Sequence, residues 1–466
     1  MFPFKKVHIV GISGAGLNGI ANLLLQMGVI ITGADKAQNK YSEFFINQGV
    51  KISSDTDIAP LEGIDLLFVT SALREDHLLI LEAKKRGIPV WTRHQLFPVL
   101  FEGRQLIAVS GSHGKTTTTS IIKHILQFCG VDCGYLIGVP DPKQSSHLGT
   151  SEVFVIEADE FAKTLLTLTP KIAVINNIDW DHPDIYPTAK DYSDTFEEFV
   201  DITLANDGII IANSDDKQIQ SIYNNLPLAK QNHFQLFGRH INSQNHIRHI
   251  RHELTGIRIG LYLEDTKYIN NDAFAPYVGE HNAMNIMAGY LVAQTLGLNL
   301  DKVTLSLKSL PTVNRRCEVL GISQNKITVL DDYGHAATEI QATLIGLKKA
   351  HPKNRVVAIW QPHSFNRISQ FEPDFVRACG YADEILITPV YDGRTSGEYN
   401  FEAFRVGLNP KTTHFVDQLD DIIDIVTRRT ASGDILVLFN AGDLNKIAPI
   451  LVKELNKAYH RGGSGN

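Results

Sequence analysis

Short apolar runs alternate with amphipathic stretches along most of the chain, and this alternation predicts an α/β protein. The runs are four or five residues long and lead into glycine or polar residues, after which apolar residues recur at helical spacing. Clear examples are residues 66–69, 106–109, 172–175 and 435–439. Such runs are typical of buried strands in parallel sheets, which are connected by helices. The pattern therefore predicts parallel sheets covered by helices.

The strongest motif lies between the run 106–109 and an apolar helical pattern at residues 121–126. Its sequence is Gly111-Ser112-His113-Gly114-Lys115-Thr116-Thr117. A strand, a glycine loop with Gly-Lys-Thr and a helix together cradle nucleotide phosphates, because loop N–H groups and the helix N-terminus face the anion. The lysine reaches the terminal phosphates, and a threonine hydroxyl can ligate Mg²⁺. The loop is a shorter variant, since Val109 stands where the usual motif has its first glycine.

A second glycine-rich turn follows the first predicted strand, at residues 6–10. Gly14-x-Gly16-x-x-Gly19 opens an apolar helix, and Asp35 ends the next strand. This matches the dinucleotide fingerprint, which alone would suggest NAD. Any nucleotide diphosphate can use the same helix N-terminus, so a nucleotide sugar stays open. Two later predicted strands end in Thr70-Ser71-Ala72 and Thr92-Arg93-His94.

Acidic and histidine side chains follow two strands of the next unit. Residues 152–156 lead into Glu157-Ala158-Asp159-Glu160, and residues 172–175 lead into a segment that ends in Asp181-His182. The carboxyl ends of parallel strands share one edge of the sheet with the phosphate loop. We therefore expect Glu157 and His182 to converge on Mg²⁺ beside the phosphates.

Three histidines, His246, His249 and His252, suggest either a metal cluster or a solvated hairpin. In a strand, a spacing of three places them on alternate faces, and neighbouring arginines would repel a cation. The hairpin is the favoured interpretation.

Further polar residues follow strands later in the chain. Asn282 and Asn285 lie near one face of the first turn of a predicted helix. Two predicted strands near the C-terminus end in Asp331-Asp332-Tyr333-Gly334-His335 and in a segment that runs from Gln361 to Arg367. Open α/β sheets bind ligands at such strand ends.

Length and composition set the overall frame. A chain of 466 residues is too long for one core and suggests about three domains. We expect a Rossmann-like N-terminal domain at 1–103, a central P-loop ATPase-like domain at 104–310 and a C-terminal Rossmann-like domain at 311–460. The glycine-rich residues 461–466 are expected to be a disordered end.

The charge and cysteine content exclude some partners. A net charge of −7 gives no electrostatic reason to expect nucleic acid or an anionic membrane as partner. The four cysteines are scattered without metal spacing, which fits a reducing compartment. No apolar run is long enough to span a bilayer. We expect a cytoplasmic protein that is a monomer or a weak homo-oligomer.

Taken in order, these motifs resemble the Mur ligase family of peptidoglycan synthesis across essentially the whole chain. The matching segments are Gly11–Gly19, Gly111–Thr117, Glu157–Glu160, Asn177–His182, His281–Asn285, Arg315-Arg316, Asp331–His335 and Gln361–His363. Each segment is weak or moderate evidence alone, but the full series in the family's order is highly specific. Within the family, the motifs are most similar to those of members that join L-alanine to UDP-N-acetylmuramate.

The resemblance implies an ATP-dependent ligase that activates a carboxylate as an acyl phosphate and then joins it to an amine. Catalytic roles would belong to Lys115, Glu157, His182 and Arg316. ATP would contact the loop residues 111–117. Asn282 and Asn285 would lie beside the adenine, Arg316 would contact a phosphate, and Asp332 would bind the ribose. Mg²⁺ would be held by Thr116, Glu157 and His182.

The resemblance also implies two substrate sites. The UDP-sugar would lie at Gly14, Gly16, Asp35, Ser71, Ala72 and Arg93. The amino acid would lie at Tyr333, His335, His363 and Arg367, where the Arg367 guanidinium suffices for one α-carboxylate. Sister ligases carry a carbamylated lysine on the helix after the histidine that matches His182. Glu197 or Phe196 occupies that place here, and the choice between them stays open.

Three alternatives compete with this interpretation. A sibling ligase adds a ready-made tripeptide to UDP-N-acetylmuramate during wall recycling. An NAD-dependent oxidoreductase would explain the first glycine turn but not the phosphate loop. A P-loop motor or switch would explain the phosphate loop, but the chain lacks the basic surface of a nucleic-acid motor.

Overall fold

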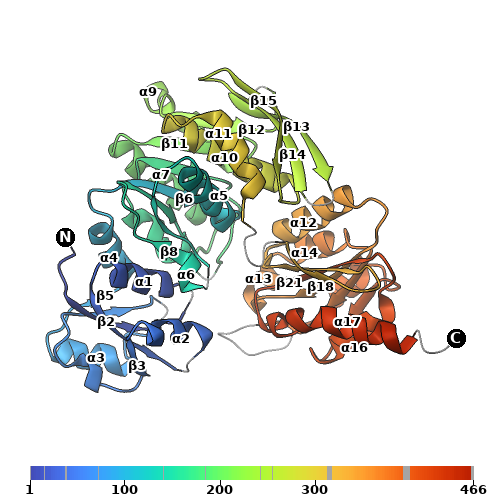
Figure 1. Ribbon diagram of the computed structural model, residues 1–466, viewed down its shortest axis with the longest axis horizontal. Helices are drawn as coiled ribbons and strands as arrows, with labels where there is room; N and C mark the ends of the chain where they lie inside the picture. The colour runs from blue at the N-terminus through green and yellow to red at the C-terminus, as the bar shows by residue number, and fades with distance from the viewer. Residues whose placement is uncertain are drawn as a thin grey trace.

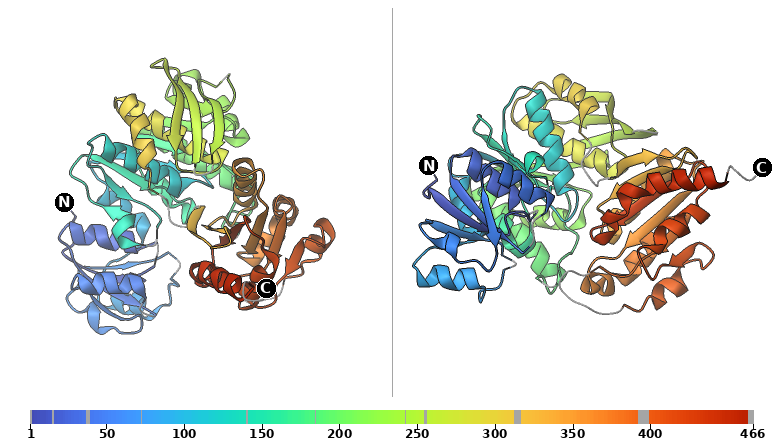
Figure 2. Two further views of the ribbon diagram at one scale, coloured as in Figure 1. Left: turned by 45° about the vertical axis from the view of Figure 1, so that its right-hand side comes forward. Right: turned by 60° about the horizontal axis from the view of Figure 1, so that its bottom comes forward.

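The computed structural model describes residues 2–14, 16–36, 39–71, 73–139, 141–183, 185–241, 243–253, 256–311, 317–391 and 399–462. Three sheets built from successive parts of the chain form three lobes, and the views in Figures 1 and 2 place the central lobe between the other two. The predicted three-part α/β fold is therefore confirmed. Among the described residues, no helix has both the length and the apolarity needed to cross a membrane.

The N-terminal lobe is a parallel sheet of five strands in the order β3-β2-β1-β4-β5. Its strands are β1 (Lys6–Val10), β2 (Ile30–Asp35), β3 (Lys51–Ser54), β4 (Leu66–Val69) and β5 (Val90–Trp91). Its helices are α1 (Asn18–Gln26), α2 (Lys40–Asn47), η1 (Ala59–Leu61), α3 (Leu78–Lys85) and α4 (Arg93–Leu100). The strand order reverses beside β1, so the glycine turn after β1 opens at the switch point of the sheet, where ligands bind.

The central lobe contains a sheet of ten strands in the order β15-β14-β13-β12-β11-β10-β6-β9-β7-β8. The strands are β6 (Gln105–Ser110), β7 (Gly134–Leu136), β8 (Ser146–His147), β9 (Val153–Glu157), β10 (Ile172–Ile175), β11 (Ile209–Asn213), β12 (Phe234–Gly238), β13 (Asn245–Glu253), β14 (Gly256–Leu263) and β15 (Tyr268–Ala275). The helices are α5 (Lys115–Phe128), α6 (Pro142–Ser145), η2 (Phe161–Thr167), α7 (Ala189–Ala205), α8 (Lys217–Asn225), α9 (Leu228–Gln231), α10 (Glu280–Thr295), α11 (Leu300–Ser306) and η3 (Leu307–Ser309).

Strand β6 lies between β9 and β10, and all three run parallel. The phosphate loop therefore shares one edge of the sheet with the residues that follow β9 and β10, as the sequence predicts. The three histidines of the possible metal cluster lie on β13, which forms an antiparallel hairpin with β14. Among the described residues, no group of three His, Cys, Asp or Glu side chains is arranged to hold a metal ion.

The C-terminal lobe is a sheet of six strands in the order β16-β17-β21-β18-β19-β20, parallel except for β16. Its strands are β16 (Glu318–Ile322), β17 (Thr328–Asp332), β18 (Val356–Gln361), β19 (Glu384–Ile387), β20 (Thr413–Phe415) and β21 (Ile435–Asn440). Its helices are α12 (Ala337–Ala350), α13 (Phe365–Gln370), α14 (Glu372–Cys379), α15 (Glu402–Gly407), α16 (Asp421–Arg429), η4 (Asp443–Lys446) and α17 (Ala448–Gly462). Helix α17 extends two residues into the predicted disordered end.

The clusters of buried apolar side chains do not follow the division into three sheets. One cluster of buried side chains runs without a break from the N-terminal sheet to one face of the central sheet. Helix α4 makes the connection, and the rings of Phe101 and Phe154 lie 4.9 Å apart. The C-terminal sheet is covered by two clusters of its own. The N-terminal and central lobes are therefore joined by apolar packing.

Candidate active site

The phosphate loop joins β6 to α5 and leaves the start of that helix open. Gly114 occupies the position before the helix with a φ of 79°, and no side chain caps the helix. A Cβ at Gly114 would lie 2.9 Å from the Asn285 side-chain oxygen, so the position requires glycine. Uncapped N–H groups at a helix N-terminus form a site for phosphate.

The Lys115 ammonium, predicted to bind the ATP phosphates, contacts protein oxygens in this structure. Its Nζ lies 2.8 Å from one carboxylate oxygen of Glu160 and 2.6 Å from the Gly111 carbonyl oxygen. Burial by itself would lower the pKa of Lys115, but the neighbouring Glu160 and Asp159 carboxylates raise it above its usual range. Lys115 is therefore a fully charged group beside the loop.

The residues predicted to hold Mg²⁺ lie around the same loop. The Thr116 hydroxyl donates to a Glu157 carboxylate oxygen at 3.0 Å, so two hard oxygen ligands lie side by side. Magnesium usually takes one or two carboxylates together with phosphate oxygens, and this pair fits such a site. His182 has a left-handed φ of 53°, a strained conformation for a residue other than glycine. The strain sets the side-chain direction at a predicted ligand.

Helix α7 carries both residues that could match the place of the carbamylated lysine. Glu197 is exposed to solvent, and Phe196 is buried in the apolar core. Neither side chain is placed as a metal ligand. On the same helix, the Tyr192 hydroxyl lies 2.8 Å from the Ser112 hydroxyl, and this hydrogen bond ties the phosphate loop to α7.

The glycine turn of the N-terminal lobe opens toward the phosphate loop. Gly16 and Arg93 line the same cavity as Lys115. The Asp35 carboxylate accepts a hydrogen bond from the Ser13 N–H at 2.9 Å, so this acid braces the turn. Gly14 lies in the turn, Ser71 is exposed after β4, and Ala72 falls outside the described residues.

The third glycine of the fingerprint has a packing role. A Cβ at Gly19 would lie 2.7 Å from a Leu136 methyl group and 3.1 Å from the Ser145 hydroxyl, both in the central lobe. Helix α1 therefore packs directly on β7 and α6. The Asn22 amide adds hydrogen bonds to the Pro142 carbonyl and the Ser146 hydroxyl, each at 3.0 Å.

The C-terminal lobe contributes Tyr333 and His335 to the same cavity. The His335 Nδ1 lies 3.1 Å from the Tyr333 carbonyl oxygen, to which it must donate. Burial and the nearby Arg367 guanidinium lower the pKa of His335 to about 3, so its ring is neutral near pH 7. The rings of His335 and His363 lie 6.0 Å apart.

Arg367 forms a buried ion pair with Asp181 across the boundary between the central and C-terminal lobes. Its Nη2 lies 2.8 Å from the Asp181 carboxylate, and each side chain is only 8% exposed. Burial by itself would raise the pKa of Asp181, but the guanidinium outweighs it and holds the pKa below its usual range. Asp181 faces the cavity, and Arg367 lies behind it.

One cavity of about 370 Å³ thus receives residues from all three lobes. The N-terminal lobe contributes the glycine turn and Arg93, the central lobe the phosphate loop with Glu157 and His182, and the C-terminal lobe Tyr333 and His335. Residues that the sequence predicts to contact phosphate, metal and substrate, and that lie far apart in the sequence, meet here.

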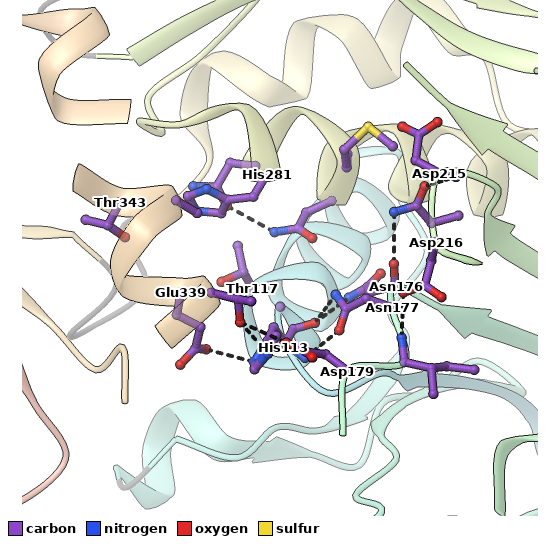
Figure 3. A pocket seen from close by; sticks show the side chains of 18 of the residues that line it. His113, Thr117, Asn176, Asn177, Asp179, Asp215, Asp216, His281, Glu339 and Thr343 are labelled. Atoms are coloured by element: carbon purple, nitrogen blue, oxygen red, sulfur yellow. Dashed lines mark hydrogen bonds and ion pairs between the residues drawn. The ribbon is translucent and has the colours of Figure 1, made fainter. Parts of the chain in front are cut away.

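A second cavity, of about 520 Å³, lies on the other side of the phosphate loop between α10 and α12 (Figure 3). Gly114 and Thr117 of the loop line it, together with Asn282, Asn285 and Asp332. The Asn285 amide donates to the Asn282 side chain at 3.0 Å, which confirms that the two share one face of α10. This cavity therefore contains several of the residues predicted to contact ATP. Arg316 falls outside the described residues.

His113 connects the phosphate loop to the C-terminal lobe at the edge of this second cavity. In Figure 3 its ring faces Asp179 and Glu339, at 3.1 and 3.6 Å. The Thr338 hydroxyl lies 2.9 Å from the same ring. Burial by itself would lower the pKa of His113, but hydrogen bonds to Asp179 and Glu339 raise it to about 10. The ring is therefore a cation shared by two carboxylates.

Several important residues were not singled out from the sequence. Glu160 belongs to a quoted motif but received no role, and its contact with Lys115 could not be read from spacing. Asp179, Asp181 and Glu339 form contacts between lobes, which depend on how the lobes are placed. A signal for Asp181 was its position at a strand end beside His182.

Comparisons with known proteins agree with this geometry. Three family models match successive parts of the chain: "Mur ligase family, catalytic domain" at residues 6–105, "Mur ligase middle domain" at 109–293 and "Mur ligase, glutamate ligase domain" at 315–442. The UDP-N-acetylmuramate–L-alanine ligase of Roseiflexus castenholzii is 32% identical, covering 97% of this chain and 98% of the relative. That of Aquifex aeolicus is 31% identical, covering 97% and 98%.

Solved structures share the whole fold. A UDP-N-acetylmuramate–alanine ligase from Thermotoga maritima has a TM-score of 0.78 at 21% identity, covering 98% of this chain and 99% of that one. A murein peptide ligase from Psychrobacter arcticus has a TM-score of 0.67 at 26% identity, covering 97% and 99%. With full-length relatives above 30% identity, and with a phosphate loop that faces residues of all three lobes, the chain belongs to the Mur ligase family of ATP-dependent ligases.

Proposed function

We propose that the protein joins L-alanine to the carboxylate of UDP-N-acetylmuramate at the expense of ATP, in cytoplasmic peptidoglycan precursor synthesis. The observation that carries the proposal is the cavity at which all three lobes meet, because the reaction needs two substrates and the ATP phosphates in contact. Full-length relatives that are named for this activity support it. The units 1–103, 104–310 and 311–460 would hold the UDP-sugar, ATP and the amino acid.

The first step activates the carboxylate, which is a poor electrophile. A carboxylate oxygen of UDP-N-acetylmuramate attacks the γ-phosphorus of ATP. The bond between this phosphorus and the bridging oxygen of the β-phosphate breaks, ADP departs, and an acyl phosphate of the sugar remains. Negative charge on the transferred group must be neutralised. Lys115 and the open N-terminus of α5 supply positive charge at this point, and Arg316 is proposed to add to it.

Magnesium would be held by Thr116, Glu157 and His182, and when bound it would supply further positive charge beside the phosphates. The chain's own contribution is to place these ligands. Gly138 lets its main-chain N–H reach the Glu157 carboxylate at 2.8 Å, because a Cβ there would lie 2.9 Å from the same oxygen. The Glu157 carboxylate is thereby oriented toward Thr116.

In the second step the amino group of L-alanine attacks the acyl carbon, and phosphate leaves. The ammonium form must first lose a proton to solvent, and the proton that the nitrogen sheds after attack leaves with the phosphate. The neutral His335 ring uses Nδ1–H on the Tyr333 carbonyl, so Nε2 carries a lone pair that can accept a hydrogen bond from the amine. With a pKa of about 3 it is a far weaker base than the aliphatic amine of the amino acid. His335 therefore orients the amine and does not keep its proton.

The α-carboxylate of L-alanine is proposed to bind Arg367, with His363 beside it. The guanidinium is held by Asp181 in this structure, so the substrate carboxylate takes the place of that side chain.

The test is ADP release by the purified protein with UDP-N-acetylmuramate against a panel of amino acids and the tripeptide. Release that requires both UDP-N-acetylmuramate and L-alanine supports the proposal. Release without any amino acid dependence contradicts it.

A second candidate is the ligase that adds a ready-made tripeptide to UDP-N-acetylmuramate. The observation in its favour is that the solved murein peptide ligase is 26% identical to this chain, against 21% for the solved alanine ligase. The curated relatives, at 31% and 32%, favour L-alanine. The same panel separates the two, because the tripeptide would then exceed L-alanine in kcat/KM.

A further inference from the structure

The Lys115 side chain is enclosed by oxygens of the protein itself. Its Nζ lies 2.8 and 3.1 Å from the two Glu160 carboxylate oxygens, 2.6 Å from the Gly111 carbonyl and 3.2 Å from the Ser112 carbonyl. An ammonium group has three N–H donors, so these contacts use all of them. Lys115 can reach a phosphate only by giving up part of this set.

Glu160 is built firmly into the fold. Its side chain is 2% exposed. Its carbonyl oxygen accepts from the Tyr186 hydroxyl at 2.5 Å and from the Lys163 N–H at 2.8 Å. Ala162 and Lys163 follow with left-handed φ values of 52° and 56°. Such strain persists only where the surrounding structure holds it. Glu160 therefore keeps its place when Lys115 moves.

A buried carboxylate that loses its cation must find another, because an unpaired buried charge is strongly destabilising. A second basic group beside Glu160 is His182, whose Nε2 lies 3.6 Å from the Glu160 carboxylate. His182 is also a proposed ligand of Mg²⁺. A divalent cation beside His182 would thus lie within reach of Glu160.

We propose that Glu160 is a positioning residue that holds Lys115 until Mg²⁺ and ATP bind. When they bind, the Glu160 carboxylate exchanges the Lys115 ammonium for the cation beside His182. The released ammonium then contacts the terminal phosphates. The inference rests on the proposed function. Its consequence is that Mg²⁺ and ATP strengthen each other's binding through Glu160, and such coupling is reciprocal.

Calorimetric titration of ATP with and without Mg²⁺ tests the coupling. Glu160→Gln is compared with Asp159→Asn, which removes a charge from the same cavity but whose carboxylate pairs with Arg93 at 3.5 Å. Glu160→Gln should tighten metal-free ATP binding by about tenfold, the scale of one hydrogen bond to a charged group. Glu160→Gln should also reduce, by the same factor, the increase in ATP affinity that Mg²⁺ causes. Asp159→Asn should keep the wild-type increase. Structural damage would instead weaken ATP binding in both conditions.

A second measurement needs no nucleotide. Lys115→Met should bind Mn²⁺ more tightly than the wild type, as measured by electron paramagnetic resonance, because the ammonium no longer competes for Glu160. The double variant Lys115→Met/Glu160→Gln should lose that gain. This measurement decides the matter if Glu160→Gln does not fold.

The inference is overturned if Glu160→Gln keeps the wild-type gain from Mg²⁺, or if Lys115→Met binds Mn²⁺ no more tightly than the wild type. In either case the proposed function is not contradicted as long as the wild type binds ATP. A wild type that binds no ATP with or without Mg²⁺ overturns both.

Discussion

The Asp181–Arg367 ion pair should hold the C-terminal lobe closed over the active site. The pair is almost fully buried and joins α13 to the segment after β10. Arg367→Ala would leave the Asp181 charge buried without a partner. Removing one member of such a pair costs about 3–5 kcal/mol, so the closed arrangement should lose a factor of roughly 10² to 10⁴ relative to an open one.

Small-angle X-ray scattering of the nucleotide-free protein measures this opening as a larger radius of gyration. Lys349→Ala is the matched control, because Lys349 pairs with Glu280 across the same lobe boundary at 2.6 Å. That pair is 48% and 35% exposed, and an exposed pair contributes only about 0–1 kcal/mol. Arg367→Ala should therefore expand the protein and Lys349→Ala should not. Adding Asp181→Asn to Arg367→Ala should restore closure, since no charge is then stranded.

The expansion caused by Arg367→Ala should also depend on pH. Arg367 holds the pKa of Asp181 below its usual range, so the pair stabilises closure above pH about 4 and loses this contribution below it. In Arg367→Ala the largest of the influences that lower the pKa of Asp181 is gone, so burial should raise this pKa relative to the wild type. The carboxyl then takes up a proton as the pH falls, and the defect should be smaller at pH 5 than at pH 8. Equal expansion in Lys349→Ala and Arg367→Ala, or an unchanged radius in Arg367→Ala, would refute the reasoning.

Four further predictions follow from the site. Lys115→Ala should still fold, with a lower unfolding temperature because the buried Glu160 carboxylate loses its cation, and should lower turnover by several orders of magnitude; turnover within a few-fold of the wild type would contradict the phosphate-loop assignment. Calorimetry should detect UDP-N-acetylmuramate and not NAD at the first glycine turn, and tight NAD binding alone would contradict the assignment. Glycine should be a poor but real substrate, because one methyl group is worth about 1 kcal/mol, and a higher kcat/KM for the tripeptide would favour the second candidate. Because the pKa of His113 is raised to about 10, its contribution to closure should be full below pH about 6.5 and lost as the pH rises toward 10. The radius of gyration of the wild type should therefore rise with pH over this range, and that of His113→Gln should not. A wild type whose radius does not change with pH would contradict the role of His113 in closure.

Local periodicity and backbone geometry were enough to predict part of the fold and of the site. The strand, glycine loop and helix around Lys115 follow from a short apolar run, a left-handed glycine and apolar residues at helical spacing. The placement of Glu157 and His182 at the loop's edge of the sheet follows from parallel strands whose ends must coincide. These features extend over a few residues or one sheet, where spacing and chirality leave few arrangements.

The pairing of the charged groups could not be predicted in the same way. The partners Asp181 and Arg367 are 186 positions apart, and Thr338 is 225 positions from His113. Such pairs depend on how separate sheets are oriented, which no periodic pattern encodes. Gly19 shows the same limit, because its motif suggests close packing of the helix but does not say that the helix packs against Leu136 and Ser145 of another lobe. A side chain's chemistry can be read from the sequence, but the partner that satisfies it when buried is chosen by the packing of the lobes.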